Sequence, residues 1–217
     1  MLQIQRFVFN EFQENTYIIW DESLQCAIVD PGCSNADERN RLKSFIEDNN
    51  LTPTLLLNTH CHIDHILGNE FVANTYNLPL HLHQEELTTY KETDRWAAMF
   101  GLPKFEVPQN LVFINVDTKL NFGNTHLEVL FTPGHSIASL SFFDSNSLNL
   151  LSGDVLFKES IGRTDLPGGN FETLAKSIKE VLYTLPNETK VFSGHGPTTS
   201  IGHEKAHNPY VSLTANS

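Results

Sequence analysis

The sequence contains little cysteine, little positive charge and no long apolar run. Its three cysteines, Cys26, Cys33 and Cys61, are odd in number and form no Cys-x-x-Cys pair. A disulfide framework and a thiolate-rich structural zinc site are therefore both disfavoured. A reducing compartment is the better expectation.

Positive charge is scarce, because 14 Lys and Arg stand against 26 Asp and Glu for a net charge of −12. No run of basic residues offsets this, so nucleic acid and anionic membranes are disfavoured as partners. No segment approaches the roughly 20 apolar residues that span a bilayer. The first twelve residues, MLQIQRFVFNEF, also lack the pattern of a signal peptide. We expect a cytoplasmic protein that acts on a small molecule.

Hydrophobic residues make up 40% of the 217 residues, enough for a substantial core. Aromatic and β-branched residues predict three antiparallel strands near the N-terminus, at 2–9, 15–20 and 25–30. Further strands are expected at 53–59, 80–82, 126–131, 139–143, 148–151 and 190–193, the last in the chain. Helices are expected at about 35–49, 69–76, 84–100 and 171–184, with a short one after Gly202. Residues 101–125 give no clear pattern. No linker divides the chain, so we expect one layered α/β domain over 1–217.

Histidine is abundant, with ten residues, and its distribution is uneven. The segment His60-Cys-His-Ile-Asp-His65 directly follows a predicted buried strand. A tight turn there would bring its four metal-binding side chains around one cavity. His135, Asp154 and His195 stand at the ends of other predicted strands, where functional loops of α/β proteins commonly gather.

Five imidazoles and two carboxylates are too many for one catalytic zinc ion, which usually takes three protein ligands. They suit two ions about 3.5–4 Å apart, as in two-metal hydrolases. We expect His60, His62 and His135 to bind one ion. Asp64, His65 and His195 would bind the other, and Asp154 would bridge the two.

These motifs together resemble those of the metallo-β-lactamase-fold hydrolases. The resemblance rests on His60-x-His62-x-Asp64-His65, Thr-Pro-Gly-His135, Gly-Asp154 and Gly-His195-Gly, and it extends from the first strands through Asp30-Pro-Gly32 to the tail. It implies an α/β fold, a four-layer αβ/βα sandwich, with two metals at one edge between the sheets.

The segments 160–169 and 194–202 are similar to those of compact proteins resembling glyoxalase II, the hydroxyacylglutathione hydrolases. Full-length members of that group carry a C-terminal helical region that helps to bind glutathione. The 22 residues after His195 are too few to supply it. We therefore expect this extension to be lacking, which puts glutathione thioesters in doubt as substrates.

Further roles follow for four residues near these motifs. Asp64 is expected to be catalytic as well as a ligand, because it can orient the nucleophile or accept its proton. Asp30 is expected to support the metal-binding loop from behind, and a turn-forming role is the alternative. Arg163 and Lys158 are the basic residues nearest to Asp154 and are candidates to bind a substrate carboxylate. Alternatively, Arg163 pins its glycine-rich loop to a core carboxylate and Lys158 is a plain surface residue.

The leading hypothesis is a hydrolase that cleaves a small thioester or ester by a hydroxide bridging two divalent ions. Zinc is the first choice of metal, with iron and manganese as alternatives. The segments THCHIDH and GRTD also resemble the persulfide dioxygenases of the same superfamily. That resemblance implies one iron held by two histidines and an aspartate, here His62 or a neighbour, His135 and Asp154. A non-catalytic metal-binding module is the third hypothesis.

Overall fold

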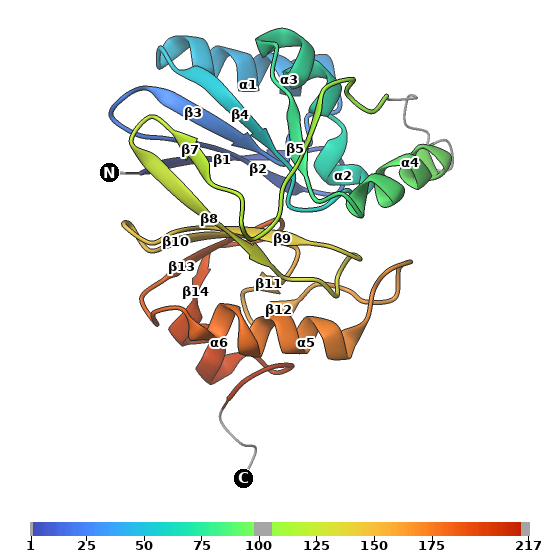
Figure 1. Ribbon diagram of the computed structural model, residues 1–217, viewed down its shortest axis with the longest axis vertical. Helices are drawn as coiled ribbons and strands as arrows, with labels where there is room; N and C mark the ends of the chain where they lie inside the picture. The colour runs from blue at the N-terminus through green and yellow to red at the C-terminus, as the bar shows by residue number, and fades with distance from the viewer. Residues whose placement is uncertain (1, 98–105, 214–217) are drawn as a thin grey trace.

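Two six-stranded sheets face each other and form the inner layers of a four-layer αβ/βα sandwich (Figure 1). The computed structural model describes residues 2–97 and 106–213. The expected α/β fold class is confirmed. Among the described residues, no helix has the length and apolar character needed to cross a membrane.

The first sheet contains the strands of the N-terminal half in sequence order. They are β1 Gln3–Phe9, β2 Glu14–Trp20, β3 Gln25–Val29, β4 Thr52–Leu57, β5 Leu80–Leu82 and β6 Leu111–Phe113. The pairs from β1 to β3 are antiparallel, as expected, and those from β3 to β6 are parallel. Because β3 and β4 run in parallel, the residues that follow them reach the same edge of the sheet.

The second sheet has the order β14-β13-β10-β9-β8-β7. Its strands are β7 Leu120–Phe122, β8 Thr125–Phe131, β9 Leu140–Asp144, β10 Asn149–Gly153, β13 Lys190–Ser193 and β14 Thr199–Ser200. The pair β10 and β13 is parallel, and the other pairs are antiparallel. The residues after β10 and β13 therefore also share one edge.

Helices cover the outer face of each sheet (Figure 1). They are α1 Ala36–Asp48 and α3 Asn69–Tyr76 on the first sheet, and α5 Phe171–Glu180 and α6 Ile201–His207 on the second. Two more, α2 Ile63–Ile66 and α4 Glu86–Ala97, pack against each other near the ends of the strands. Asn35 starts α1 by accepting a hydrogen bond from the backbone N–H of Glu38, as its residue type predicts.

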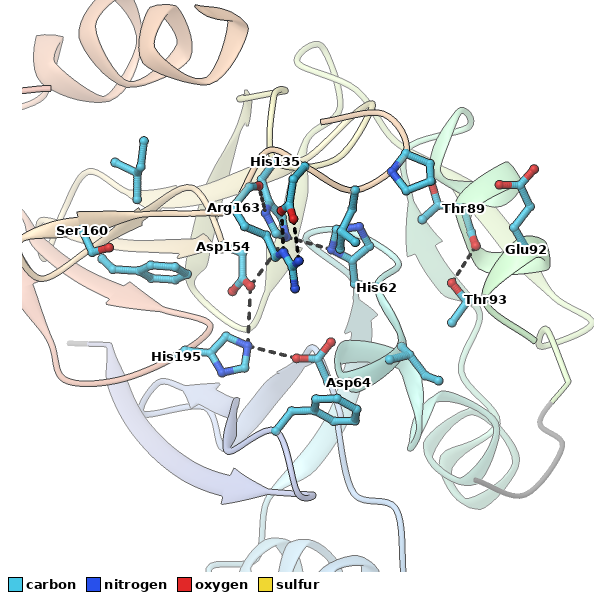
Figure 2. A pocket seen from close by; sticks show the side chains of 17 residues that line it. His62, Asp64, Thr89, Glu92, Thr93, His135, Asp154, Ser160, Arg163 and His195 are labelled. Atoms are coloured by element: carbon cyan, nitrogen blue, oxygen red, sulfur yellow. Dashed lines mark hydrogen bonds and ion pairs between the residues drawn. The ribbon is translucent and has the colours of Figure 1, made fainter. Parts of the chain in front are cut away.

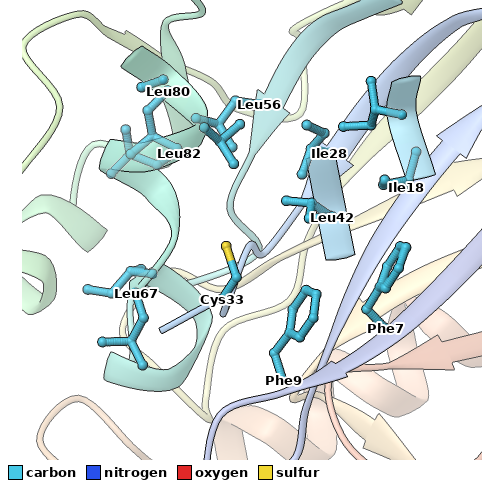
Figure 3. Packing of buried hydrophobic residues seen from close by; sticks show 14 of the residues in the cluster. Phe7, Phe9, Ile18, Ile28, Cys33, Leu42, Leu56, Leu67, Leu80 and Leu82 are labelled. Carbon is cyan, nitrogen blue, oxygen red and sulfur yellow. The ribbon is translucent and has the colours of Figure 1, made fainter. Parts of the chain in front are cut away.

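The core lies in three layers because strand side chains alternate between the two faces of a sheet. Ile18 and Ile28 pack under the helices of the first sheet (Figure 3). Ile19 and Val29, on the opposite face, pack against the second sheet. Phe143, Leu150, Leu174 and Ile178 are among the residues of the third cluster, beneath α5.

Some boundaries differ from those expected. The strand 190–193 is not the last, because β14 pairs with it from the chain that follows. The loop after Asp154 contains a small hairpin, β11 Leu156–Phe157 and β12 Ser160–Ile161. Strands of two residues carry no periodic signal, which explains why sequence patterns miss them. Helix α4 begins at Glu86 rather than at 84, and the part of the predicted helix beyond residue 97 lies outside the described residues.

Candidate metal centre

All seven predicted ligands meet at one edge of the sandwich, between the two sheets. Figure 2 labels five of them, His62, Asp64, His135, Asp154 and His195. The first sheet contributes the segment that follows β4, in which α2 begins directly after His62. This short helix is the expected turn, and it brings Asp64 and His65 toward the same cavity. The second sheet contributes His135 after β8, Asp154 after β10 and His195 after β13.

His60, His62 and His135 form the first cluster. His135 Nε2 lies 2.8 Å from His62 Nδ1 and 3.2 Å from His60 Nε2. Burial lowers the pKa of His60, and it lowers the pKa of His62 to about 3, with the neighbouring imidazoles adding to the effect. These two rings are therefore neutral at pH 7, the form in which imidazole binds metals.

Asp64, His65 and His195 form the second cluster. Asp64 Oδ2 lies 3.0 Å from His195 Nε2 and 3.6 Å from His65 Nε2. Burial alone would raise the pKa of Asp64, but the attraction of His65 and the hydrogen bond with His195 outweigh it and lower the pKa. Asp64 is therefore ionised at neutral pH.

Asp154 lies between the two clusters. Its Oδ2 is 3.6 Å from His135 Nε2 and 3.5 Å from His195 Nε2, and its Oδ1 is 3.4 Å from His65 Nε2. Burial would raise the pKa of this carboxyl, but the nearby histidines, His65 first, lower it. A carboxylate in this position can reach ions at both clusters.

Two buried polar atoms in this group, Asp154 Oδ1 and His65 Nε2, have no hydrogen-bond partner in the described part of the chain. Such atoms are rare in native proteins because leaving them unpaired costs free energy. The two atoms lie 3.4 Å apart, and a divalent ion bound between them would satisfy both. The residues present therefore fit two divalent metal ions.

Asp30 supports the second cluster from behind. Its Oδ2 lies 3.1 Å from His65 Nδ1, and its Oδ1 accepts hydrogen bonds from the Thr59 backbone N–H at 2.7 Å and from Asn58 Nδ2 at 3.2 Å. Asp30, His60 and His65 are also close enough to hold an ion together. We assign Asp30 no ion, because both its oxygens are engaged with the loop that follows β4.

Backbone and buried groups hold other members of the centre in place. His135 Nδ1 donates a hydrogen bond to the Arg163 carbonyl oxygen at 2.8 Å, which directs Nε2 toward the first cluster. Glu14 is fully buried, with Oε1 3.9 Å from His65 Nδ1, and burial raises its pKa. Nothing in the sequence pattern singles out Glu14 or the equally buried Glu86, because isolated glutamates in strands and helices are usually exposed.

A cavity of about 880 Å³ opens onto the metal centre (Figure 2). Its apolar walls are formed by Phe12, Ile63, Phe157, Ile161, Leu166 and Pro167. Its polar lining includes Thr89, Glu92 and Thr93 from α4, and Ser160, Arg163 and Asp165 from the opposite loop. This size and composition suit a small organic molecule.

The two basic residues proposed for substrate binding are placed differently. Arg163 lines the cavity, where its Nε and Nη2 each lie 2.7 Å from the Asp165 carboxylate. Asp165 is 68% exposed, so Arg163 is not tied to a core carboxylate. Lys158 is exposed and is not among the residues that line the cavity.

The family model of the Metallo-beta-lactamase superfamily matches residues 9–195. A probable metallo-hydrolase of Bacillus subtilis, YqgX, is 40% identical over 209 residues, which cover 95% of this chain and 96% of the relative. The hydroxyacylglutathione hydrolase GloC of Haemophilus influenzae is 32% identical over 212 residues, covering 97% and 98%.

Solved structures show the same fold. The BLEG-1 B3 metallo-beta-lactamase superposes with a TM-score of 0.86 at 33% identity, covering 96% of this chain and 99% of that one. TTHA1623 in a di-iron-bound form gives 0.83 at 34% identity, covering 95% and 99%. ETHE1 from Myxococcus xanthus gives 0.79 at 27% identity, covering 97% and 84%.

Proposed function

Because the chain belongs to the metallo-beta-lactamase superfamily, we propose that it is a two-metal hydrolase that cleaves a small thioester or ester. The observation that carries the proposal is the pair of adjoining ligand clusters with Asp154 between them. A mononuclear iron site needs two histidines and a carboxylate and would leave the second cluster without a purpose.

The ions, when bound, would lower the pKa of water to near neutrality and polarise the substrate carbonyl. Asp64 is ionised and lines the cavity, with Oδ2 beside His195, so it can orient the attacking water or take up its proton. Asp30 keeps His65 in one orientation through Nδ1. Phe12, Ile63 and Phe157 line the cavity with apolar side chains, against which the acyl group would lie.

Thioesters are the first choice of substrate because GloC, a hydroxyacylglutathione hydrolase, is similar along nearly the whole chain. We propose Arg163 as the contact for a carboxylate of the substrate. Its bond to Asp165 joins two side chains that are 61% and 68% exposed, and such surface pairs exchange partners at little cost. Zinc is our first choice of metal, and the di-iron form of TTHA1623 keeps iron as the alternative.

Metal content and activity, measured on one preparation, test the proposal. We expect about two metal ions per chain and hydrolysis of S-lactoylglutathione or of a neutral thioester, S-acetyl-N-acetylcysteamine, that stops on chelation. Asp154→Ala should lower metal content at both clusters and reduce kcat/KM by at least about 100-fold, because the carboxylate that would contact both ions is lost.

The matched control is Asp117→Ala, which removes an exposed carboxylate in the loop before β7 and should leave metal content and rate unchanged. One iron per chain, with oxygen consumption on glutathione persulfide and no thioester cleavage, would favour the dioxygenase instead. Two metals with full activity in Asp154→Ala would contradict the bridging role.

A further inference from the structure

Glu86, the first residue of α4, is fully buried and does not line the cavity. Its Oε2 accepts a hydrogen bond from the Cys61 backbone N–H at 2.9 Å. Its Oε1 accepts two more, from Ser136 Oγ at 2.6 Å and from the Ala138 backbone N–H at 2.9 Å. One carboxylate therefore contacts two separate loops.

These two loops carry the whole of the first ligand cluster. Cys61 stands between His60 and His62, and Ser136 directly follows His135. The first loop belongs to the half of the chain that forms the first sheet, and the second loop belongs to the half that forms the second sheet. The bond from Ser136 to Glu86 spans 50 positions in sequence, and that from Ala138 spans 52.

The local structure fixes the position of this carboxylate. The Glu86 backbone N–H bonds to the His83 carbonyl oxygen, which holds the first turn of α4 in place. At the N-terminus of a 12-residue helix, the helix dipole favours a negative charge. Thr93, two turns further along α4, shares its hydroxyl proton between the Thr89 carbonyl oxygen at 2.7 Å and the Cys61 carbonyl oxygen at 3.2 Å. Both polar groups of the Cys61 backbone are thus held by α4.

We propose that Glu86 is a positioning residue for the metal centre, and that its carboxylate sets the distance between the His60–His62 loop and His135. An ion can bind all three histidines only if their nitrogen atoms are placed to within a few tenths of an ångström. His60 and His62, however, belong with the first sheet, and His135 belongs with the second. The hydrogen bonds of Glu86 define that separation directly. The inference rests on the metal centre of the proposed function and is independent of the substrate.

The variant Glu86→Gln tests the proposal with little change in side-chain volume. An amide has one acceptor oxygen, so its NH₂ group must face either the Cys61 N–H or the donors of Ser136 and Ala138. We expect the ion at His60, His62 and His135 to bind at least 10-fold more weakly, in line with the effect of losing groups that orient metal ligands. The ion at Asp64, His65 and His195 should be retained.

Titration of the metal-free protein with Co²⁺ measures both sites through the visible absorption of bound cobalt. Wild type should bind two equivalents, and Glu86→Gln should bind the affected equivalent only at a free Co²⁺ concentration at least 10-fold higher. Glu85→Gln is the matched control, since the neighbouring side chain is exposed and the same chemical change there should leave both equivalents unaltered.

Thermal unfolding separates positioning from a general loss of stability. If Glu86 positions the ligands, the stabilisation conferred by metal, which is the difference between metal-loaded and metal-free melting temperatures, should shrink in Glu86→Gln. Equal destabilisation of both forms with unchanged cobalt affinity would overturn the proposal.

Should Glu86→Gln fail to fold, Ser136→Ala removes one donor and keeps the rest of the arrangement. It should weaken the same site several-fold, and unaltered cobalt binding in this variant would then count against the proposal. A wild-type chain that binds no metal would instead contradict the proposed function itself.

Discussion

Gly194 shows how closely single atoms are packed around the metal centre. A Cβ added at this position would overlap Asp154 Oδ1 and would lie 2.6 Å from His65 Cε1. Two hydrogen bonds restrain the backbone, because the Gly194 N–H bonds to the Gly153 carbonyl at 2.9 Å and its carbonyl accepts from the Asn15 N–H at 2.7 Å. Glycine is required here for close approach.

Gly194→Ala should therefore disturb Asp154 and His65 together. We expect less than one metal ion per chain after dialysis and a fall in kcat/KM of at least about 100-fold, with elemental analysis and the thioester assay as measurements. Gly196→Ala is the contrast. No atom of the described residues lies within 4 Å of its added Cβ, but its φ of +73° strains any other residue. That variant should lose about 1 kcal/mol of stability and keep its metals. Normal metal content in Gly194→Ala would contradict the packing argument.

At the residue scale, sequence patterns single out candidate ligands far better than the groups that lie behind them. The spacing from His60 to His65 is conspicuous because four metal-binding side chains lie within six positions. Glu14 and Glu86 are not conspicuous, since what distinguishes them is contact with backbone or side chains distant in sequence. Such partners are determined by tertiary packing, which no local pattern reports.

At the scale of elements, Asp21 joins the two sheets at the end of β2. Its Oδ1 accepts from the Ser23 backbone N–H, and its Oδ2 accepts from the Asn124 N–H at 2.7 Å and from Thr125 Oγ1 at 2.9 Å. Burial would raise the pKa of Asp21, but the hydrogen bonds, those from Ser23 first, outweigh it and lower the pKa. The carboxylate therefore fastens the β7–β8 hairpin to the first sheet.

A lowered pKa in the folded state predicts how this contribution varies with pH. The stabilisation is complete above the unfolded pKa of about 3.9 and is lost as the pH falls through the lower, folded value. Asp21→Asn should cost about 1–3 kcal/mol at pH 7, because an amide group then faces donors. Urea unfolding of metal-free protein should show this difference between wild type and variant shrinking below pH 4. A difference that stays constant down to pH 2 would contradict the assignment.

Elements of four or more residues were largely predictable, and so was the three-residue strand β5 Leu80–Leu82, but the two-residue strands were not. Helix α1 is marked by Asn35 and by two acids in its first turn, and the strands β2 and β3 by their aromatic and β-branched residues. In contrast, β11 and β14 have two residues each and exist because a neighbouring strand offers free hydrogen-bonding groups. That the two sheets face each other was expected only from the family resemblance. Periodicity identifies the buried face of a strand but not the element that packs against it.

At the scale of the whole molecule, the proposed metals would join two bodies that are separate in sequence. The ligands from residues 60–65 belong with the first sheet, and His135, Asp154 and His195 belong with the second. Each ion would have ligands from both. Metal binding should therefore stabilise the packing of one sheet against the other as well as the loops.

Removal of metal should lower the melting temperature of the whole chain. A free metal concentration of 100 times the dissociation constant adds about 2.7 kcal/mol to the free energy of unfolding. For a protein of this size, that corresponds to a rise in melting temperature of roughly 5–10 °C. Calorimetry before and after chelation measures the shift, and Zn²⁺ should restore it. In Asp154→Ala, chelation should change the melting temperature little. An unchanged melting temperature in chelated wild type would show that the sheets pack independently of metal.

The hydrogen bonds of Asn15 to the far end of the chain have a consequence for the order of folding. Its Nδ2 donates to the Ser193 carbonyl at 2.9 Å, a contact that spans 178 positions. Closing so long a loop is entropically expensive, so such contacts form late. His195 lies two residues further along the chain, so the candidate ligand set is complete when the two ends of this loop have come together. A nascent or partly folded chain would thus hold an incomplete ligand set, and hydrolytic competence would appear only as the last step of folding.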